Sequence, residues 1–143
     1  MKVLGAVMIL SALALAIAPV FTDCESQGKM LTTADGRAVS MKCHWTGIAE
    51  IGAAVPLAIG GIYALRGRRR DSMRLAAFTG AASGLMAILL PLKLIGTCMN
   101  PSMICNVLMK PSLLTAGILA ITASVVLFVV AREQEYRVAL SAA

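Results

Sequence analysis

Cysteines and methionines are the residues of this 143-residue sequence best suited to chemistry, because thiols can form disulfides and both side chains can bind metals. The four cysteines are Cys24, Cys43, Cys98 and Cys105. An even number of cysteines in an oxidising compartment favours disulfide bonds. Four cysteines allow three connectivities, and the simplest predicts the bonds Cys24–Cys43 and Cys98–Cys105.

A second interpretation is a Cu(I) site, because thiolates and thioethers are soft ligands that suit this ion. The candidate ligands are Met41, Cys43, His44, Cys98, Met99, Met103 and Cys105. Disulfide formation would remove the thiolates, so the two interpretations exclude one another. The sequence has no Cys-x-x-Cys-His motif for haem attachment.

A third interpretation is extracytoplasmic thiol redox chemistry. Two cysteine pairs on two outer loops resemble the layout of quinone-linked membrane oxidases that generate disulfides. Those enzymes carry a Cys-x-x-Cys pair, which is absent here. The sequence also has no phosphate-binding loop and no zinc-protease motif, and its single histidine restricts acid–base catalysis. A non-enzymatic protein without a cofactor is therefore favoured. Cu(I) and a quinone are the cofactors that the second and third interpretations would require.

The composition requires that these residues be positioned by membrane-spanning helices. Hydrophobic residues make up 59% of the chain, charged residues 14%, and the mean hydropathy is +0.84. Soluble domains have about 45–50% apolar and about 25% charged residues. Four apolar runs are each long enough to cross a lipid bilayer as a helix. They predict one all-α domain over residues 1–143, a four-helix transmembrane bundle with spans 3–21, 47–65, 75–95 and 112–131.

The first apolar run also resembles a signal peptide, since Ala16-Ile17-Ala18 is typical of a cleavage site. Cleavage would leave three spans. Pro19 follows directly and disfavours cleavage, so we expect four.

The basic residues predict the orientation of the bundle. The loop from Arg66 to Arg74 contains five arginines in nine residues, which is typical of a cytoplasmic loop. Both termini are then cytoplasmic, and all four cysteines face the extracytoplasmic side. The net charge of +6 is therefore mainly a signal of topology and does not indicate a nucleic-acid partner.

The first outer loop is expected to contain a short β-hairpin. Asp35-Gly36 is a strong signal for a two-residue turn, and centring the turn there places Met30 opposite Met41. This arrangement brings the neighbourhoods of Cys24 and Cys43 together. We therefore predict a small outer cap that rests on the helix ends and is held by disulfides.

The order of landmarks along the chain suggests two related helical hairpins. A proline precedes a cysteine at the end of the first and third spans, at Pro19 and Pro91. A Met-x-Cys motif then precedes each returning span. The match is loose, because the spacings differ.

Two further pairs of residues are candidates for roles inside the membrane. Glu50 and Lys93 lie at comparable depth and are expected to form an intramembrane charge pair. The alternative is that Lys93 extends to the membrane surface and Glu50 lies in the headgroup zone. Gly80 and Gly84 form a GxxxG motif, which predicts close packing with a neighbouring span or with another protein.

Several of these residues also carry a resemblance to a known family. They are Met41-Lys-Cys43-His44-Trp45-Thr46 with Glu50, Leu94-Ile95-Gly96-Thr97-Cys98, Met103-Ile-Cys105 and Pro111. The sequence resembles a domain-of-unknown-function group of small four-helix bacterial membrane proteins. The resemblance implies a multi-pass protein of a bacterial plasma membrane and a gene association with ABC-type export permeases. It also supports treating Cys24, Cys43, His44, Glu50, Cys98, Met103 and Cys105 as one constellation.

The leading functional hypothesis is a non-enzymatic accessory or assembly component of a membrane complex, such as an ABC-type exporter. Its partners would be the lipid bilayer and either that permease or further copies of the chain. The alternatives are the quinone-linked redox protein and the Cu(I)-binding protein described above.

Overall fold

The computed structural model describes residues 2–66 and 70–141, with side chains described for 2–66 and 71–133. Arg68 and Arg69 of the predicted cytoplasmic loop lie outside the described residues. The described elements follow the order α1 Lys2–Thr22, β1 Leu31–Thr32, β2 Ala38–Val39, α2 Lys42–Arg66, α3 Arg70–Leu89, η1 Leu90–Leu94, η2 Cys105–Met109 and α4 Lys110–Ser141. The segments η1 and η2 are single π-helical turns that continue α3 and precede α4.

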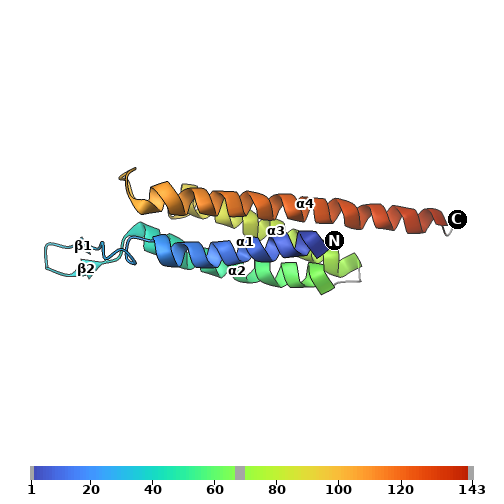
Figure 1. Cartoon of the computed structure of the whole chain (residues 1–143), viewed down its shortest axis with the longest axis horizontal. Helices are drawn as coiled ribbons and strands as arrows, with labels where there is room; N and C mark the ends of the chain where they lie inside the picture. The colour runs from blue at the N-terminus through green and yellow to red at the C-terminus, as the bar shows by residue number, and fades with distance from the viewer. Residues whose placement is uncertain (1, 67–69, 142–143) are drawn as a thin grey trace.

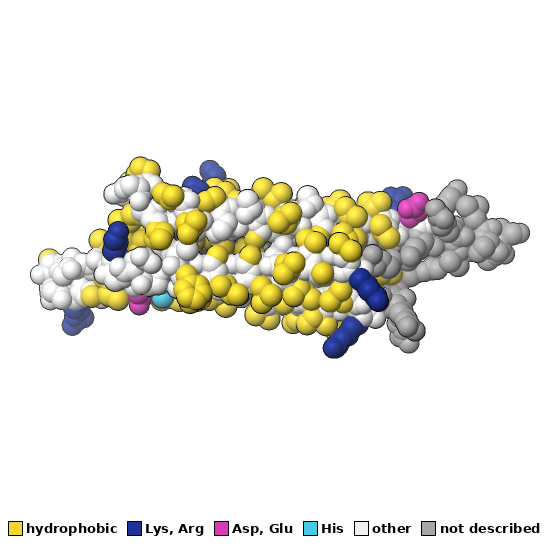
Figure 2. All heavy atoms as spheres, viewed as in Figure 1, with side chains coloured by type: hydrophobic (Ala, Val, Ile, Leu, Met, Phe, Trp, Pro, Cys, Tyr) yellow, Lys and Arg dark blue, Asp and Glu magenta, His cyan; other side chains and the backbone are white. Residues whose placement is uncertain are grey.

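The four helices lie side by side as an elongated bundle, with the start of α1 and the end of α4 at the same end (Figure 1). Four segments of the described residues are long and apolar enough to cross a membrane: Lys2–Thr22, Lys42–Arg66, Asp71–Leu94 and Cys105–Glu133. Large apolar side chains such as Leu10, Phe78 and Val129 point outward. Figure 2 shows this apolar surface along the bundle, with lysines and arginines gathered near its two ends. The prediction of four packed helices that are able to span a membrane is confirmed, and these helices indicate a multi-pass membrane protein.

Two helical hairpins make up the bundle, as the landmarks in the sequence suggested. Helix α1 packs most extensively on α2, and α3 packs most extensively on α4. Each hairpin contains a pair of glycines where the two backbones meet. A Cβ added at Gly5 would lie 2.9 Å from the carbonyl oxygen of Gly61, and one added at Gly84 would lie 2.9 Å from that of Gly117. Small residues therefore set the helix separation, as is typical of packing in membranes.

The GxxxG motif packs within the chain. A Cβ at Gly80 would contact the side chains of Ser124 and Met8, and Gly84 faces Gly117 and Ile121. The sequence left open whether a neighbouring span or another protein packs against this motif. In the structure, a neighbouring span packs against it.

The β-hairpin is present, but its register differs from the prediction by one residue. Leu31 pairs with Val39 and Thr32 pairs with Ala38, so Met30 is not opposite Met41. The turn has three residues, because Thr33 and Arg37 are joined by a backbone hydrogen bond and Gly36 adopts a φ of 75°. A left-handed glycine that closes such a loop is a common alternative to the two-residue turn. The strands are exposed and project away from the helix ends, so they do not cover them (Figure 1).

The close approach of α3 and α4 predicts that Gly84→Ala destabilises the protein by about 1–3 kcal/mol, because the new methyl group overlaps the Gly117 carbonyl. Gly52→Ala is the matched control, since nothing lies within 4 Å of a Cβ at that helical position. Thermal unfolding in one detergent compares the two variants. Equal loss of stability in both would contradict a specific contact at Gly84.

Candidate functional site

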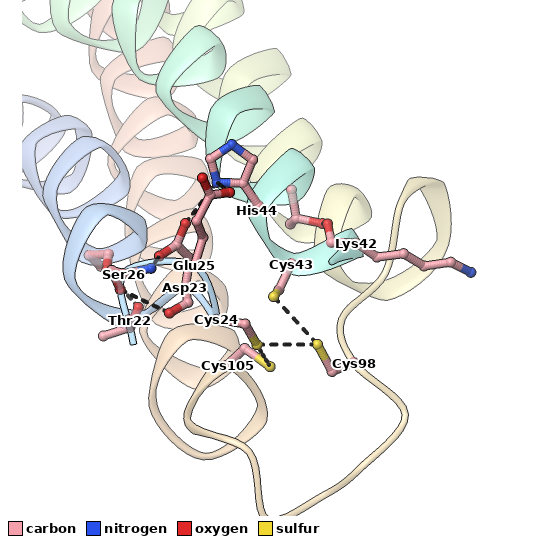
Figure 3. Close-up of polar contacts among 12 residues, drawn as sticks. Thr22, Asp23, Cys24, Glu25, Ser26, Lys42, Cys43, His44, Cys98 and Cys105 are labelled. Atoms are coloured by element: carbon pink, nitrogen blue, oxygen red, sulfur yellow. Dashed lines mark hydrogen bonds and ion pairs between the residues drawn. The ribbon is translucent and has the colours of Figure 1, made fainter. Parts of the chain in front are cut away.

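The four cysteine sulfurs converge at the end of the bundle that carries the β-hairpin. All four Sγ atoms lie within 4.8 Å of one another. The shortest distances are 3.3 Å for Cys24–Cys98, 3.4 Å for Cys43–Cys98 and 3.6 Å for Cys24–Cys105. Figure 3 shows the four side chains pointing toward a common centre. We call these four residues the thiol cluster.

Four different parts of the chain supply the thiol cluster. Cys24 follows the end of α1, and Cys43 lies in the first turn of α2. Cys98 lies in the loop after η1, and Cys105 begins η2. Cys24, Cys43 and Cys105 are buried, while Cys98 is partly exposed. The cluster therefore forms only when the ends of all four helices meet.

Two polar side chains hold the loop that carries Cys98. The Thr46 hydroxyl on α2 donates to the Gly96 carbonyl at 2.6 Å, and Gly96 itself has a φ of 84°. The Asn106 amide nitrogen donates to the carbonyls of Cys98 at 2.6 Å and Asn100 at 2.8 Å. Thr97 donates to the Asn106 side-chain oxygen at 2.6 Å. The sequence did not identify Thr46 and Asn106 as supports of this loop, although Asn106 directly follows a cysteine.

The predicted disulfide-stapled cap is wrong for this structure. All four cysteines are free, and the shortest sulfur distances exceed the ~2.05 Å of a disulfide bond. The closest sulfurs also belong to different outer loops, whereas the expected pairs lay within one loop. The reason is that the four side chains converge on one centre, where each sulfur meets sulfurs from the other outer loop (Figure 3).

Burial keeps the thiols of Cys24 and Cys98 protonated when no ligand is bound. Burial, together with hydrogen bonding to Cys43 and Cys98, raises the pKa of the Cys24 thiol far above its ordinary value. Burial likewise raises the pKa of Cys98 to about 11. These thiols are poor free nucleophiles near neutral pH, because the thiolate is the reactive form.

The geometry of the thiol cluster fits one metal ion. A tetrahedral ion with metal–sulfur bonds of about 2.3 Å separates its sulfur ligands by about 3.8 Å. The described sulfurs need to shift only slightly to reach that arrangement. A four-sulfur tetrahedral set is typical of Zn²⁺ or an iron–sulfur centre, and thiolates also select Cu(I).

The other predicted ligands divide into two groups. The thioether of Met41 lies 3.7 Å from the Cys98 sulfur. Met103 is partly buried against the hydrophobic core of the bundle. Met99 is fully exposed. His44 faces away from the sulfurs in Figure 3, because its Nδ1 lies 2.9 Å from Asp23 and 3.1 Å from Glu25. The structure thus brings Met41 to the thiol cluster and places Met99 and His44 outside it.

The contact between His44 and Asp23 joins the end of α1 to the start of α2. Asp23 also accepts a hydrogen bond from the Ser26 backbone nitrogen at 2.7 Å. Burial raises the pKa of Asp23, but hydrogen bonds from His44 and Ser26 outweigh it, and the pKa lies below its ordinary value of 3.8. Because Asp23 precedes Cys24 and His44 follows Cys43, this contact fixes the positions of two cluster residues.

The predicted charge pair of Glu50 and Lys93 is not formed. Glu50 is fully buried, and its carboxylate oxygens have no hydrogen-bond partner among the described residues. Lys93 is exposed on η1. The π-helical turn η1 contains Pro91, and the lysine on this turn extends to the surface.

The chain belongs to the family described as a domain of unknown function (DUF4418), whose model matches residues 3–130. The family identification made from the sequence is confirmed. No curated protein and no solved structure matches the chain.

The contact at Asp23 predicts a pH-dependent loss of stability. Asp23→Asn should lower the free energy of unfolding by about 1–2 kcal/mol near neutral pH, because a buried acceptor for His44 is weakened. The folded pKa is below 3.8, so the stabilisation is present above about pH 4 and is lost as the pH falls through the folded value. Thermal unfolding at about pH 7 and about pH 3 measures the difference between variant and wild type. Asp35→Asn on the exposed hairpin is the control, and a difference that does not shrink in acid would contradict this account.

Proposed function

We propose that this protein binds one thiophilic metal ion, Cu(I) or Zn²⁺, through Cys24, Cys43, Cys98 and Cys105 at the extracytoplasmic end of its transmembrane bundle. The observation that carries the proposal is the convergence of four sulfurs within 4.8 Å from four separate segments. Helix packing alone gives no reason to gather four thiols at one point. A shared metal ion does, because it bonds to all four at once.

The protonated thiols define the chemistry of binding. The ion must displace protons from the sulfurs, since the thiolate is the ligand. Burial raises the pKa of Cys98 to about 11, so protons compete strongly with the metal. Affinity should therefore rise with pH over the range in which these thiols remain protonated.

The side of the membrane is part of the proposal. Arg66 and Arg74 lie at the end of the bundle opposite the thiol cluster, which supports a cytoplasmic position for that end. The cluster then faces an oxidising compartment, where free neighbouring thiols tend to form disulfides. A bound metal ion would protect the thiols from oxidation.

Thiol redox chemistry is the second candidate, because Cys98 lies almost equally close to two partners. Its sulfur is 3.3 Å from Cys24 and 3.4 Å from Cys43, so either disulfide requires only a small movement. Oxidation of one pair by a quinone would give a disulfide and a hydroquinone, with two electrons and two protons transferred. The raised pKa of Cys24 and of Cys98 weighs against this candidate, because it suppresses the attacking thiolate.

An accessory role in a membrane complex, such as an ABC-type exporter, is compatible with metal binding and remains a proposal. An apolar groove of about 490 Å³ between α2 and α3 supports it. Small residues including Ala49, Gly52, Ala53 and Ala82 line the groove and would allow a partner helix to approach closely. Co-purification from native membranes tests this role, and recovery of the chain without a stoichiometric partner in every detergent would contradict it.

Metal binding by the cluster predicts that Cys98→Ser lowers affinity for Cu(I) and Zn²⁺ on the order of 100-fold or more, since loss of even a supporting residue costs about 10–100-fold. Chelator competition on freshly isolated, reduced full-length protein measures the affinity, and X-ray absorption counts the sulfur ligands. Met99→Leu is the control on the same loop, because that side chain is fully exposed.

Each outcome of this experiment separates the candidates. Four sulfur ligands and a selective loss in Cys98→Ser support the metal centre. Equal metal affinities in Cys98→Ser and Met99→Leu would contradict the metal centre. The redox candidate would be favoured instead if the freshly isolated protein contains a disulfide and if a quinone regenerates this disulfide after reduction.

A further inference from the structure

Met41 carries a fifth sulfur to the thiol cluster. Its thioether lies 3.7 Å from the Cys98 sulfur, which is close to the about 3.8 Å expected between two sulfur ligands of one tetrahedral ion. The Cys98 sulfur also lies 3.3 Å from that of Cys24 and 3.4 Å from that of Cys43. The thioether of Met41 is therefore spaced from Cys98 as a ligand of the same ion would be.

The start of α2 fixes the position of Met41 relative to the cluster. Met41 directly precedes the helix, and its carbonyl accepts a hydrogen bond from the His44 backbone nitrogen at 3.1 Å. The hydrogen bond from the Thr46 hydroxyl to the Gly96 carbonyl holds the loop of Cys98 against the same helix end. The approach of the thioether to the thiol thus follows from contacts that already position the cluster.

Met41 and Cys98 lie on the side of the thiol cluster that faces solvent. Cys24, Cys43 and Cys105 are buried, whereas Cys98 and Met41 are partly exposed. An ion that arrives from solvent therefore meets the sulfurs of Met41 and Cys98 before the three buried thiols. A thioether carries no proton, so it binds an arriving ion without first losing one.

The side chains beside the cluster distinguish Cu(I) from Zn²⁺. Zinc sites use Cys, His, Asp and Glu, whereas a thioether is a soft ligand that suits Cu(I). The imidazole of His44 would suit Zn²⁺, but it is held by Asp23 and Glu25 and faces away from the sulfurs (Figure 3). The thioether of Met41 instead lies against the Cys98 sulfur. Of these two neighbours, the one that reaches the thiol cluster favours Cu(I).

We propose that the ion of the thiol cluster is Cu(I), and that Met41 is a further ligand that admits it at Cys98. This inference rests on the proposed metal centre and narrows its ion to Cu(I). The copper arrives as Cu⁺ and stays Cu⁺, so no electron is transferred. Each thiol that becomes a ligand releases one H⁺ to solvent, and the thioether of Met41 releases none.

X-ray absorption on full-length protein labelled with selenomethionine tests the ligand directly. Reduced wild type, Met41→Leu and Met99→Leu are each loaded with one equivalent of Cu(I) without oxygen. Copper–selenium scattering at bonding distance is expected in wild type and in Met99→Leu, and it is expected to be lost in Met41→Leu. Met99 is the matched control, because its side chain on the loop of Cys98 is fully exposed.

Chelator competition on the same proteins gives a second readout. Met41→Leu nearly conserves side-chain volume, and it is expected to lower the affinity for Cu(I) by about 10-fold or more while leaving the affinity for Zn²⁺ unchanged.

The outcomes separate this inference from the proposed function. Copper bound to sulfur in labelled wild type without copper–selenium scattering would overturn the role of Met41 and leave the thiol centre standing. Equal losses of Cu(I) and Zn²⁺ affinity in Met41→Leu would overturn the selectivity for Cu(I). Copper and zinc bound without cysteine sulfur would overturn the proposed function itself.

Discussion

The close approach of helix backbones at small residues is the constraint on which the rest of the structure depends. Gly84 and Gly117 let α3 and α4 touch, and Gly5 and Gly61 do the same for α1 and α2. Lipid offers little hydrophobic driving force between helices, so contact of this kind provides much of the association. The buried core of the resulting bundle contains side chains from all four helices.

This close packing of the helices explains why four cysteines that are distant in sequence become neighbours. Each lies where its segment enters or leaves the bundle, and the helix ends bring the sulfurs within 4.8 Å of one another. Hydrogen bonds from Thr46 and Asn106 hold the loop of Cys98, while the His44–Asp23 contact holds the turn of Cys24. The same geometry buries the thiols and raises the pKa of Cys98, so the metal binding that we propose would release protons at this end of the molecule.

The sequence predicted the chemical types at the site better than their arrangement. Sequence spacing could not distinguish disulfide bonds from a metal site. Disulfide bonds within each outer loop and a single cluster of all four thiols use the same four cysteines. Met99 and His44 were plausible ligands by adjacency, yet one is fully exposed and the other is bound to two carboxylates. Counting residues placed Glu50 and Lys93 at the same depth in the membrane. Counting does not fix the direction of a side chain within a π-helical turn, where Lys93 lies.

The sequence by itself determined the four spans, the hairpin between the first two and the family, because apolar length, turn residues and motif order are local properties. Only the tertiary structure decided the register of that hairpin, the freedom of the four thiols, their convergence and the absence of a partner for Glu50 among the described residues. The physical reason is that these features depend on how far each helix extends and which face it turns inward. Contacts between all four helices set both.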